Sequence, residues 1–283
     1  MFGVDSRQVA LLIFLTSMVW TPYRAYSQAD QLRMVFWDDQ PNENLDILNE
    51  PWDGVFLLTS YASHATHKID RSGRLRGFFL DSKREKVPGG SVLLGHYTLQ
   101  PIPPYAEYGV AGEHSRHEGL DLFGDSINIA ISPADSHGTN DTSRITARVY
   151  IPPLVTLDEP AFINLREIPY TPIRAGTIIR WNADTLNQNQ VKIILEFDPE
   201  STQNEYIFKG RARRKTKSVR YIATNDTGLY TLSKEDLRGF PINSYINLSV
   251  ARGVAIQLEN RERKFLFYSY TVVACGVQLK NKN

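Results

Sequence analysis

All six histidines of this 283-residue chain, whose imidazole rings can bind divalent metal ions, lie in its first half. No histidine follows His137, and His114, His117 and Glu118 fall within five consecutive residues. Imidazole nitrogen and carboxylate oxygen suit Zn²⁺. However, glycines bound this segment and favour a loop, so no helix aligns the two rings, and the order is not the His-Glu-x-x-His of zinc peptidases. We interpret the segment as a solvated loop and predict no cofactor and no metal ligand, with metal-dependent activity as an alternative.

A candidate nucleophile follows in the block Gly124-Asp125-Ser126. This block resembles that of the GDSL esterases and lipases, and the resemblance implies Ser126 as the residue that attacks an ester. Such a serine needs a histidine, paired with an aspartate, far down the chain to take its proton. The last histidine is His137, and Asp135 has the wrong spacing for that partner block. We therefore predict a turn that leads into a strand at Ile127, and no catalytic residue.

A dense run of cations lies in the second half, preceded by four carboxylates. The cations are Lys209, Arg211, Arg213, Arg214, Lys215, Lys217 and Arg220, and the carboxylates are Glu196, Asp198, Glu200 and Glu205. Such a run has the charge to meet phosphate, an acidic glycan or lipopolysaccharide. A hairpin would instead place the acidic and basic stretches opposite each other. We favour this cross-strand pairing, with the cations also protecting a sheet edge.

Aromatic and acidic residues near the N-terminus suggest a surface that binds sugars. Trp37-Asp38-Asp39 and Trp52-Asp53 stand among Asn42, Asn44 and Asn49. Sugars stack on aromatic faces and hydrogen-bond to carboxylates and amides. Large aromatic residues are more often buried, so core packing is the competing interpretation.

The first residues have the layout of a secretory signal peptide. Arg7 precedes the uncharged run Val9–Trp20, which is too short for a membrane-spanning helix of about 20 residues. Ala25-Tyr26-Ser27 fits the small-x-small cleavage rule, so we predict residues 1–27 as a signal peptide and Gln28 as the new N-terminus. No cysteine lies near this cut, and the exported chain is therefore predicted to be secreted or periplasmic, neither a lipoprotein nor membrane-spanning.

The elements that must position these residues read as β-strands. Alternating apolar residues occur at 127–131, 145–151, 191–197 and 246–250, and the stretch Lys264–Val273 is apolar on both faces. The turn signals Asp70–Gly73 and Asn225–Gly228 predict two hairpins, and the best helical candidate is the short Leu232–Leu237. The prediction is an all-β fold of antiparallel β-sandwiches.

Prolines mark a candidate domain boundary. Five of the fifteen fall between Pro152 and Pro172, which indicates a rigid linker or an extended crossover within one domain. We predict two tandem domains, residues 28–155 and 156–283. In the second, Gly176–Asp184 with Val191–Phe197, and Asp226–Tyr230 with Tyr245–Arg252, resemble immunoglobulin-like and fibronectin type III modules of exported bacterial proteins. That resemblance implies a β-sandwich that binds, spaces or displays.

Composition narrows the classes of function. The chain is 42% hydrophobic and 22% charged, with a formal net charge of +1, so neither disorder nor nucleic-acid binding is expected. The single cysteine, Cys275, lies in an apolar stretch and is interpreted as core. We predict a non-enzymatic exported protein that binds glycan or envelope protein, or is a structural module. The alternative is a hydrolase, glycosidase-like, whose paired carboxylates meet only in the fold.

Overall fold

The computed structural model describes residues 52–65, 68–83, 85–102, 107–110, 116–132, 144–160, 171–212, 215–259 and 263–280. They belong to one compact unit, Asn49–Asn283. The predicted signal peptide, the Trp37-Asp38-Asp39 block with Asn42, Asn44 and Asn49, and His114, His137, Arg213 and Arg214 lie outside these residues.

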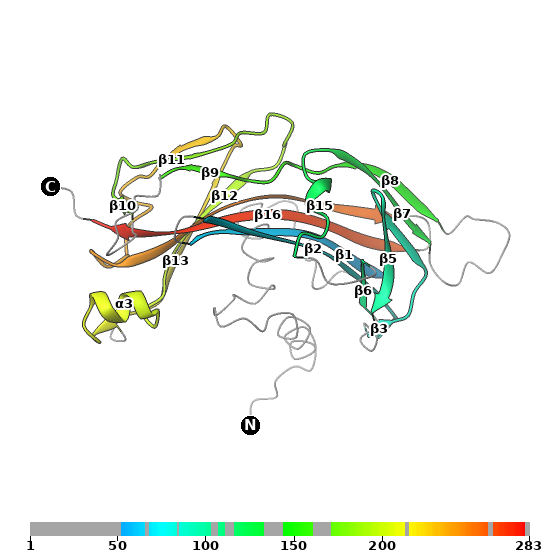
Figure 1. The fold of residues 1–283 in the computed structure, drawn as a ribbon, viewed down its shortest axis with the longest axis horizontal. Coiled ribbons are helices and arrows are strands. Elements are labelled where there is room, and N and C mark those ends of the chain that lie inside the picture. The colour runs from blue at the N-terminus through cyan, green and yellow to red at the C-terminus, as the bar shows by residue number, and fades with distance from the viewer. Residues whose placement is uncertain are drawn as a thin grey trace, which may run out of the picture. The chain divides into compact units, whose positions relative to one another are not determined.

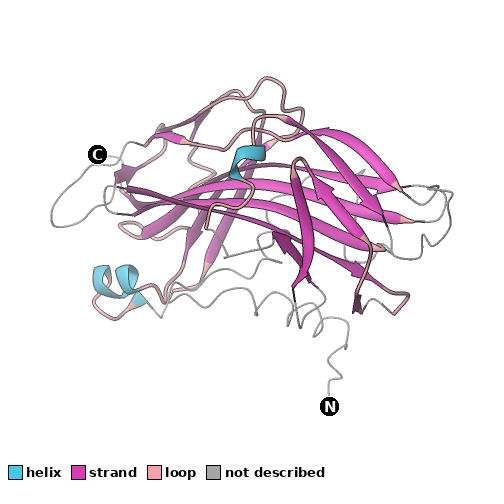
Figure 2. Ribbon diagram, turned by 45° about the vertical axis from the view of Figure 1, so that its right-hand side comes forward, coloured by secondary structure: helices cyan, strands magenta, loops and turns pink. Residues whose placement is uncertain are grey.

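Most of the described chain is β-strand, which confirms the all-β prediction (Figures 1 and 2). Sheet A has thirteen strands in the order β13-β12-β15-β16-β1-β2-β6-β5-β4-β7-β8, with β10 beside β16 and β3 beside β2. Sheet B has the order β14-β11-β9. The strands of sheet A are β1 (Gly54–Ala65), β2 (Lys68–Leu80), β3 (Lys86–Val87), β4 (Ser91–Leu94), β5 (Tyr97–Ile102), β6 (Glu107–Val110), β7 (Ser126–Ser132), β8 (Ile145–Tyr150), β10 (Thr171–Ile173), β12 (Val191–Phe197), β13 (Ser218–Thr224), β15 (Tyr245–Glu259) and β16 (Lys264–Leu279). Those of sheet B are β9 (Leu157–Glu159), β11 (Ile178–Trp181) and β14 (Leu229–Thr231).

Sheet A is mixed, which corrects the prediction of antiparallel sheets. β1 runs parallel to β16 from Gly54↔Phe265 to His64↔Cys275, and β10 also runs parallel to β16. The reason is connectivity, because no hairpin joins the first described strand to the last, so their relative direction is free. Strands from both predicted domains therefore share one sheet, and the boundary at residues 155 and 156 stays a prediction.

The long strands β1, β15 and β16 carry two hydrophobic cores on the same face of sheet A. Along β16, Phe265 and Phe267 belong to one core, while Val273 and Cys275 belong to the other. Odd-numbered residues of a strand share a face, so the two cores are neighbours along one surface. We call the core with Phe265 the β4–β8 core, because strands β4 to β8 contribute to it, and the core with Cys275 the sheet B core.

The predicted hairpin turn at Asp70–Gly73 is wrong. β2 runs through this segment, and β1 pairs with it antiparallel down to Ala65↔Lys68, so the strands reverse next to residues 66 and 67. Gly73 serves close packing instead: a Cβ there would lie 2.6 Å from the Glu118 carbonyl oxygen and 2.6 Å from the Leu120 side chain. The glycine that signals a turn can equally mark such an approach.

Two further local predictions need correction. Asn225–Gly228 is a turn, with Gly228 at φ 78°, but β13 before it and β14 after it lie in different sheets and do not form a hairpin. Leu232–Leu237 forms turns, whereas the short helix α3 spans Thr202–Ile207. Ser201 caps α3 by accepting a hydrogen bond from the Asn204 amide at 3.3 Å. The other short helical element is the 3-10 helix η1, Leu120–Leu122. Within the described chain, no helix has the length and apolarity needed to cross a membrane.

Candidate functional site

A row of polar side chains separates the two cores and forms the most connected polar cluster of the described chain. Ser60 pairs in register with Thr271, which in turn pairs with Arg252, so β1, β16 and β15 each place a polar residue on one rung. Arg71 on β2 joins them by donating to Ser60 Oγ at 3.3 Å. We call Ser60, Arg71, Arg252 and Thr271 the polar belt.

The polar belt holds an extended crossover, residues 153–156, over sheet A. Arg252 Nη1 donates to the Pro153 carbonyl at 3.1 Å, and Arg71 Nη2 donates to the Val155 carbonyl at 2.9 Å. The Val155 amide donates to Thr271 Oγ1 at 3.3 Å. Buried backbone groups must be paired, and here side chains from three strands do what a neighbouring strand would otherwise do.

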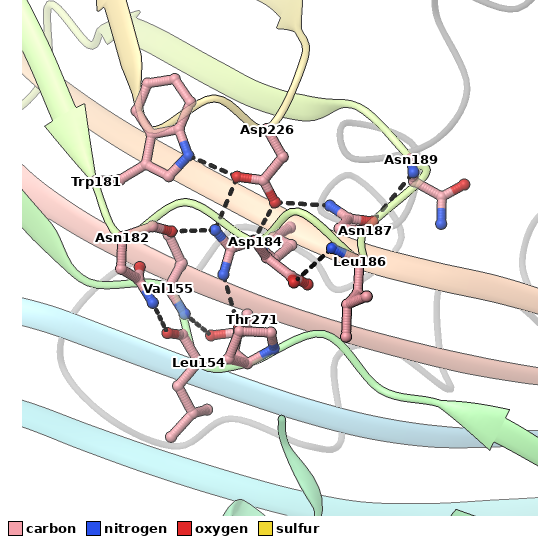
Figure 3. A network of polar contacts seen from close by, with 12 residues as sticks. Leu154, Val155, Trp181, Asn182, Asp184, Leu186, Asn187, Asn189, Asp226 and Thr271 are labelled. Atoms are coloured by element: carbon pink, nitrogen blue, oxygen red, sulfur yellow. Dashed lines mark hydrogen bonds and ion pairs between the residues drawn. The ribbon is translucent and has the colours of Figure 1, made fainter. Parts of the chain in front are cut away.

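Asn182, just after β11, secures the crossover from its other side (Figure 3). Its Nδ2 donates to the Leu154 carbonyl at 2.9 Å, and its Oδ1 accepts the Thr156 amide at 2.7 Å. The Asn182 backbone amide also donates to the Thr156 carbonyl at 3.3 Å. Its own carbonyl accepts a hydrogen bond from Arg252 Nη2. Residues 153–156 thus run as an extended crossover between β8 and β9.

The charge of Arg252 is balanced by Asp226 in a fully buried ion pair. Their side chains are 0% and 1% exposed, with Nε 2.7 Å from Oδ2 and Nη2 2.8 Å from Oδ1. Trp181 Nε1 donates to Oδ1 at 2.9 Å, and Asn187 Nδ2 donates to Oδ2 at 2.8 Å, so both carboxylate oxygens are engaged (Figure 3). A two-point arginine–carboxylate contact is the strong form of this interaction.

A second carboxylate, Asp184, extends the cluster toward β8. It accepts the Tyr150 hydroxyl at 3.1 Å and, through Oδ1, the Leu186 amide at 3.0 Å. Burial, helped by this hydrogen bond to Asp184, raises the pKa of Tyr150. The tyrosine therefore stays a hydroxyl donor, and the contact joins the end of β8 to the loop after β11.

The chemistry that this cluster can perform is positioning. The cluster holds two carboxylates, Asp226 and Asp184, and each is hydrogen-bonded to other groups of the protein. Arg252 is held by its ion pair with Asp226 and by its hydrogen bond to the crossover, so its role in the cluster is to position these segments. The cluster fixes the crossover and the loops at 182–187 and 225–228 to the long strands. No group of three His, Cys, Asp or Glu residues that could hold a metal ion occurs within the described ranges.

Gly124-Asp125-Ser126 forms the predicted turn into a strand. Gly124 has φ 89°, Asp125 accepts the Ser126 amide through its side chain at 2.6 Å, and β7 begins at Ser126. The Gly124 amide and the Asp125 carbonyl both bond to Ile151, which ties the turn to the end of β8. These contacts give Asp125 a structural use.

The described residues of the histidine-rich segment, His117 and Glu118, differ in their exposure to solvent. His117 is exposed, whereas Glu118 is buried and forms an ion pair with Arg76 at 2.7 Å. Gly73 and His117 make an isolated parallel bridge that holds the segment against β2. The carboxylate that suggested a metal ligand thus neutralises an arginine of the neighbouring strand.

The predicted pairing of the acidic and basic stretches is confirmed at one contact. β12 and β13 are antiparallel, and Glu196 of β12 binds Lys217, just before β13, at 3.0 Å. Lys215 lies 4.8 Å from the centre of the Phe208 ring. Asp198 accepts the Glu200 amide at 2.9 Å and so shapes the start of the α3 loop.

Trp52 and Cys275 follow the core interpretation. Trp52 is 4% exposed, and Asp53 accepts the Lys264 amide at 2.7 Å. Cys275 is buried in the sheet B core, where burial raises the pKa of its thiol to about 12. The sequence signal for Arg252 is its position between Val250 and Val254, where the alternating residues of the same stretch, from Ile246 to Leu258, are otherwise apolar.

Comparison with known proteins leaves the family open. No protein-family model matches the chain, and no curated protein matches its sequence. Among solved structures, the yeast delta-COP-I mu-homology domain is similar over 81% of this chain and 98% of its own, with 9% identity and a TM-score of 0.25.

Proposed function

We propose that this chain is an exported, non-enzymatic β-protein that acts outside the cytoplasm by binding a glycan or an envelope protein, or as a structural module. The observation that carries the proposal is that carboxylates which could act in catalysis form ion pairs within the chain. Asp226, Glu118 and Glu196 each neutralise a cation of the same chain. Groups held in this way hold strands together, and they are not arranged around a shared open site.

Binding is tested with the purified chain on an array of defined neutral and acidic glycans, together with isolated envelope proteins. Saturable binding to one class supports the proposal. The competing hydrolase is tested on the same glycans by measuring new reducing ends. Release of reducing ends that stops in the Asp184→Asn variant would overturn the non-enzymatic assignment.

Export is tested separately by sequencing the N-terminus of the protein that accumulates outside the cytoplasm. We expect Gln28 to be the first residue, because Ala25-Tyr26-Ser27 fits the cleavage rule. An N-terminus at Met1 on a protein that stays in the cytoplasm would refute export, whatever the binding array shows.

A further inference from the structure

Among the described residues, β13 has a strand partner on one side only, at the end of sheet A. It pairs with β12 on one side, and none of the other described strands pairs with it on the second side (Figure 1). Its seven residues include no proline and no glycine, and Val219 is 38% exposed. An open strand edge presents a row of backbone donors and acceptors to which an extended segment can add.

Arg220 places a charged group with unmet hydrogen-bonding capacity on this open strand. Its Nη2 makes one long hydrogen bond, 3.5 Å, to the Arg238 carbonyl. Its Nε is buried and has no hydrogen-bond partner in the described structure. No carboxylate of the described residues forms an ion pair with Arg220, in contrast to Lys217, which Glu196 neutralises. A buried donor left unpaired is unfavourable, and a carboxylate from outside the chain would provide the missing acceptor.

The surroundings of β13 favour an acidic occupant over a second copy of this chain. Lys209 and Arg211 are exposed in the segment that leads to β13. Two β13 edges paired with each other would bring both sets of cations together, which is unfavourable. The opposite end of sheet A differs, because the end of β8 is tied back by Tyr150 to Asp184 and by Ile151 to Asp125.

We propose that β13 receives an extended acidic segment of a partner protein, which adds a strand to sheet A and places a carboxylate on Arg220. This inference deepens the proposed binding function and rests on it. Backbone hydrogen bonds to β13 supply affinity, and the arginine contact selects acidic segments over neutral or basic ones.

The test titrates the purified chain with a synthetic nonapeptide in which glutamate alternates with valine. We expect Arg220→Gln to weaken binding about tenfold, the loss of one charge-assisted contact, while Arg148→Gln on β8 leaves it unchanged. Amide hydrogen exchange should slow across 218–224 when the peptide is bound. Arg220→Lys, which keeps the charge, is expected to retain part of the affinity, and urea unfolding of each variant verifies its fold.

Four results would overturn the inference, three of them with the peptide. The first is equal affinity for a peptide with proline in place of valine, which cannot form the backbone hydrogen bonds of a strand. The second is an equal loss of peptide affinity in the Arg148→Gln and Arg220→Gln variants. The third is no change in amide hydrogen exchange across 218–224 when the peptide is added. Binding of polygalacturonate in place of the peptide would also overturn it, in favour of an acidic glycan. A glycan or envelope-protein signal that persists in Arg220→Gln would leave the proposed function standing while this inference fails.

Discussion

At the scale of single residues, Arg252 is the least expected feature of the molecule. A fully buried arginine in the middle of a β-strand is expensive unless its charge and its donors are all satisfied. Here Asp226 forms an ion pair with Nε and accepts a hydrogen bond from Nη2, and the carbonyls of Pro153 and Asn182 accept further hydrogen bonds. The residue replaces apolar packing at the place where two cores meet, and in exchange it fixes two loops and a crossover.

Removing one partner of this pair should therefore be costly. We expect Arg252→Met or Asp226→Asn to lower the free energy of unfolding by about 3–5 kcal/mol, because each leaves a buried charge or buried acceptors unpaired. Urea denaturation measures the change. The matched control is Arg180→Met, whose partner Glu159 lies 3.7 Å away on an exposed surface; it should cost about 1 kcal/mol or less. Similar losses at both sites would contradict the structural role of the Arg252–Asp226 pair.

Glu196 gives stability a defined dependence on pH. Burial raises its pKa and outweighs the opposing effect of Lys217. Because the folded-state pKa lies above the unfolded one, this contribution is fully present below the unfolded pKa and is lost as pH rises through the folded pKa. Glu196→Gln should consequently gain stability relative to the parent protein as the pH rises above the ordinary pKa of a glutamate.

Unfolding in urea at several pH values measures this gain. Lys217→Gln serves as the counterpart, since removal of the cation raises the pKa of Glu196 further and should steepen the loss of stability with rising pH. A difference between Glu196→Gln and the parent that stays constant with pH would contradict the assignment.

At the scale of elements, α3 depends on one asparagine. Asn204 is fully buried, donates to the carbonyls of Asp198 and Tyr245 at 2.8 and 3.1 Å, and accepts the Tyr245 amide at 2.8 Å. In this way the short helix is anchored to the first residue of β15. A helix of six residues has little intrinsic stability, so α3 depends on anchors of this kind to stay folded.

We expect Asn204→Ala to cost about 1–3 kcal/mol, since it leaves buried backbone groups of Tyr245 unpaired. Amide hydrogen exchange should accelerate within 202–207 more than elsewhere. Gln203→Ala on the same helix is the control and should change the unfolding free energy little. Uniform acceleration over the whole chain in Asn204→Ala would show that α3 is not held by this residue alone.

The elements also show which parts of the fold a sequence can predict. Alternation located β7, β8 and β12 because those strands expose one face and bury the other or lie wholly in a core. The turn signal failed at Gly73, where the glycine admits a neighbouring carbonyl. The helix α3 was not predicted, because its anchor is 41 residues away in Tyr245. Pairing of β1 with β16 joins the two ends of the described chain and has no local signature. The polar belt was missed for the same reason, because Arg252 and Asp226 meet only in three dimensions.

At the scale of the whole molecule, the shared strands bear on the prediction of two domains. The β4–β8 core and the sheet B core lie on one face of β1, β15 and β16, with the polar belt between them. A substitution that destabilises one core should also destabilise the other, because both cores pack on β1, β15 and β16 and both are lost if these strands separate. We therefore expect one cooperative unfolding transition.

Leu94→Ala tests this coupling. Leu94 of β4 is fully buried in the β4–β8 core, and its truncation should lower the free energy of unfolding by about 2–5 kcal/mol. If the cores are coupled, the urea midpoint followed by hydrogen exchange of β11 and β12, in the other core, falls together with that of β4 and β7. Ile193→Ala in the sheet B core is the reciprocal variant and should lower both midpoints as well. If each variant shifts only the midpoint of its own core, residues 28–155 and 156–283 unfold independently, and the continuous sheet joins two domains that are stable separately.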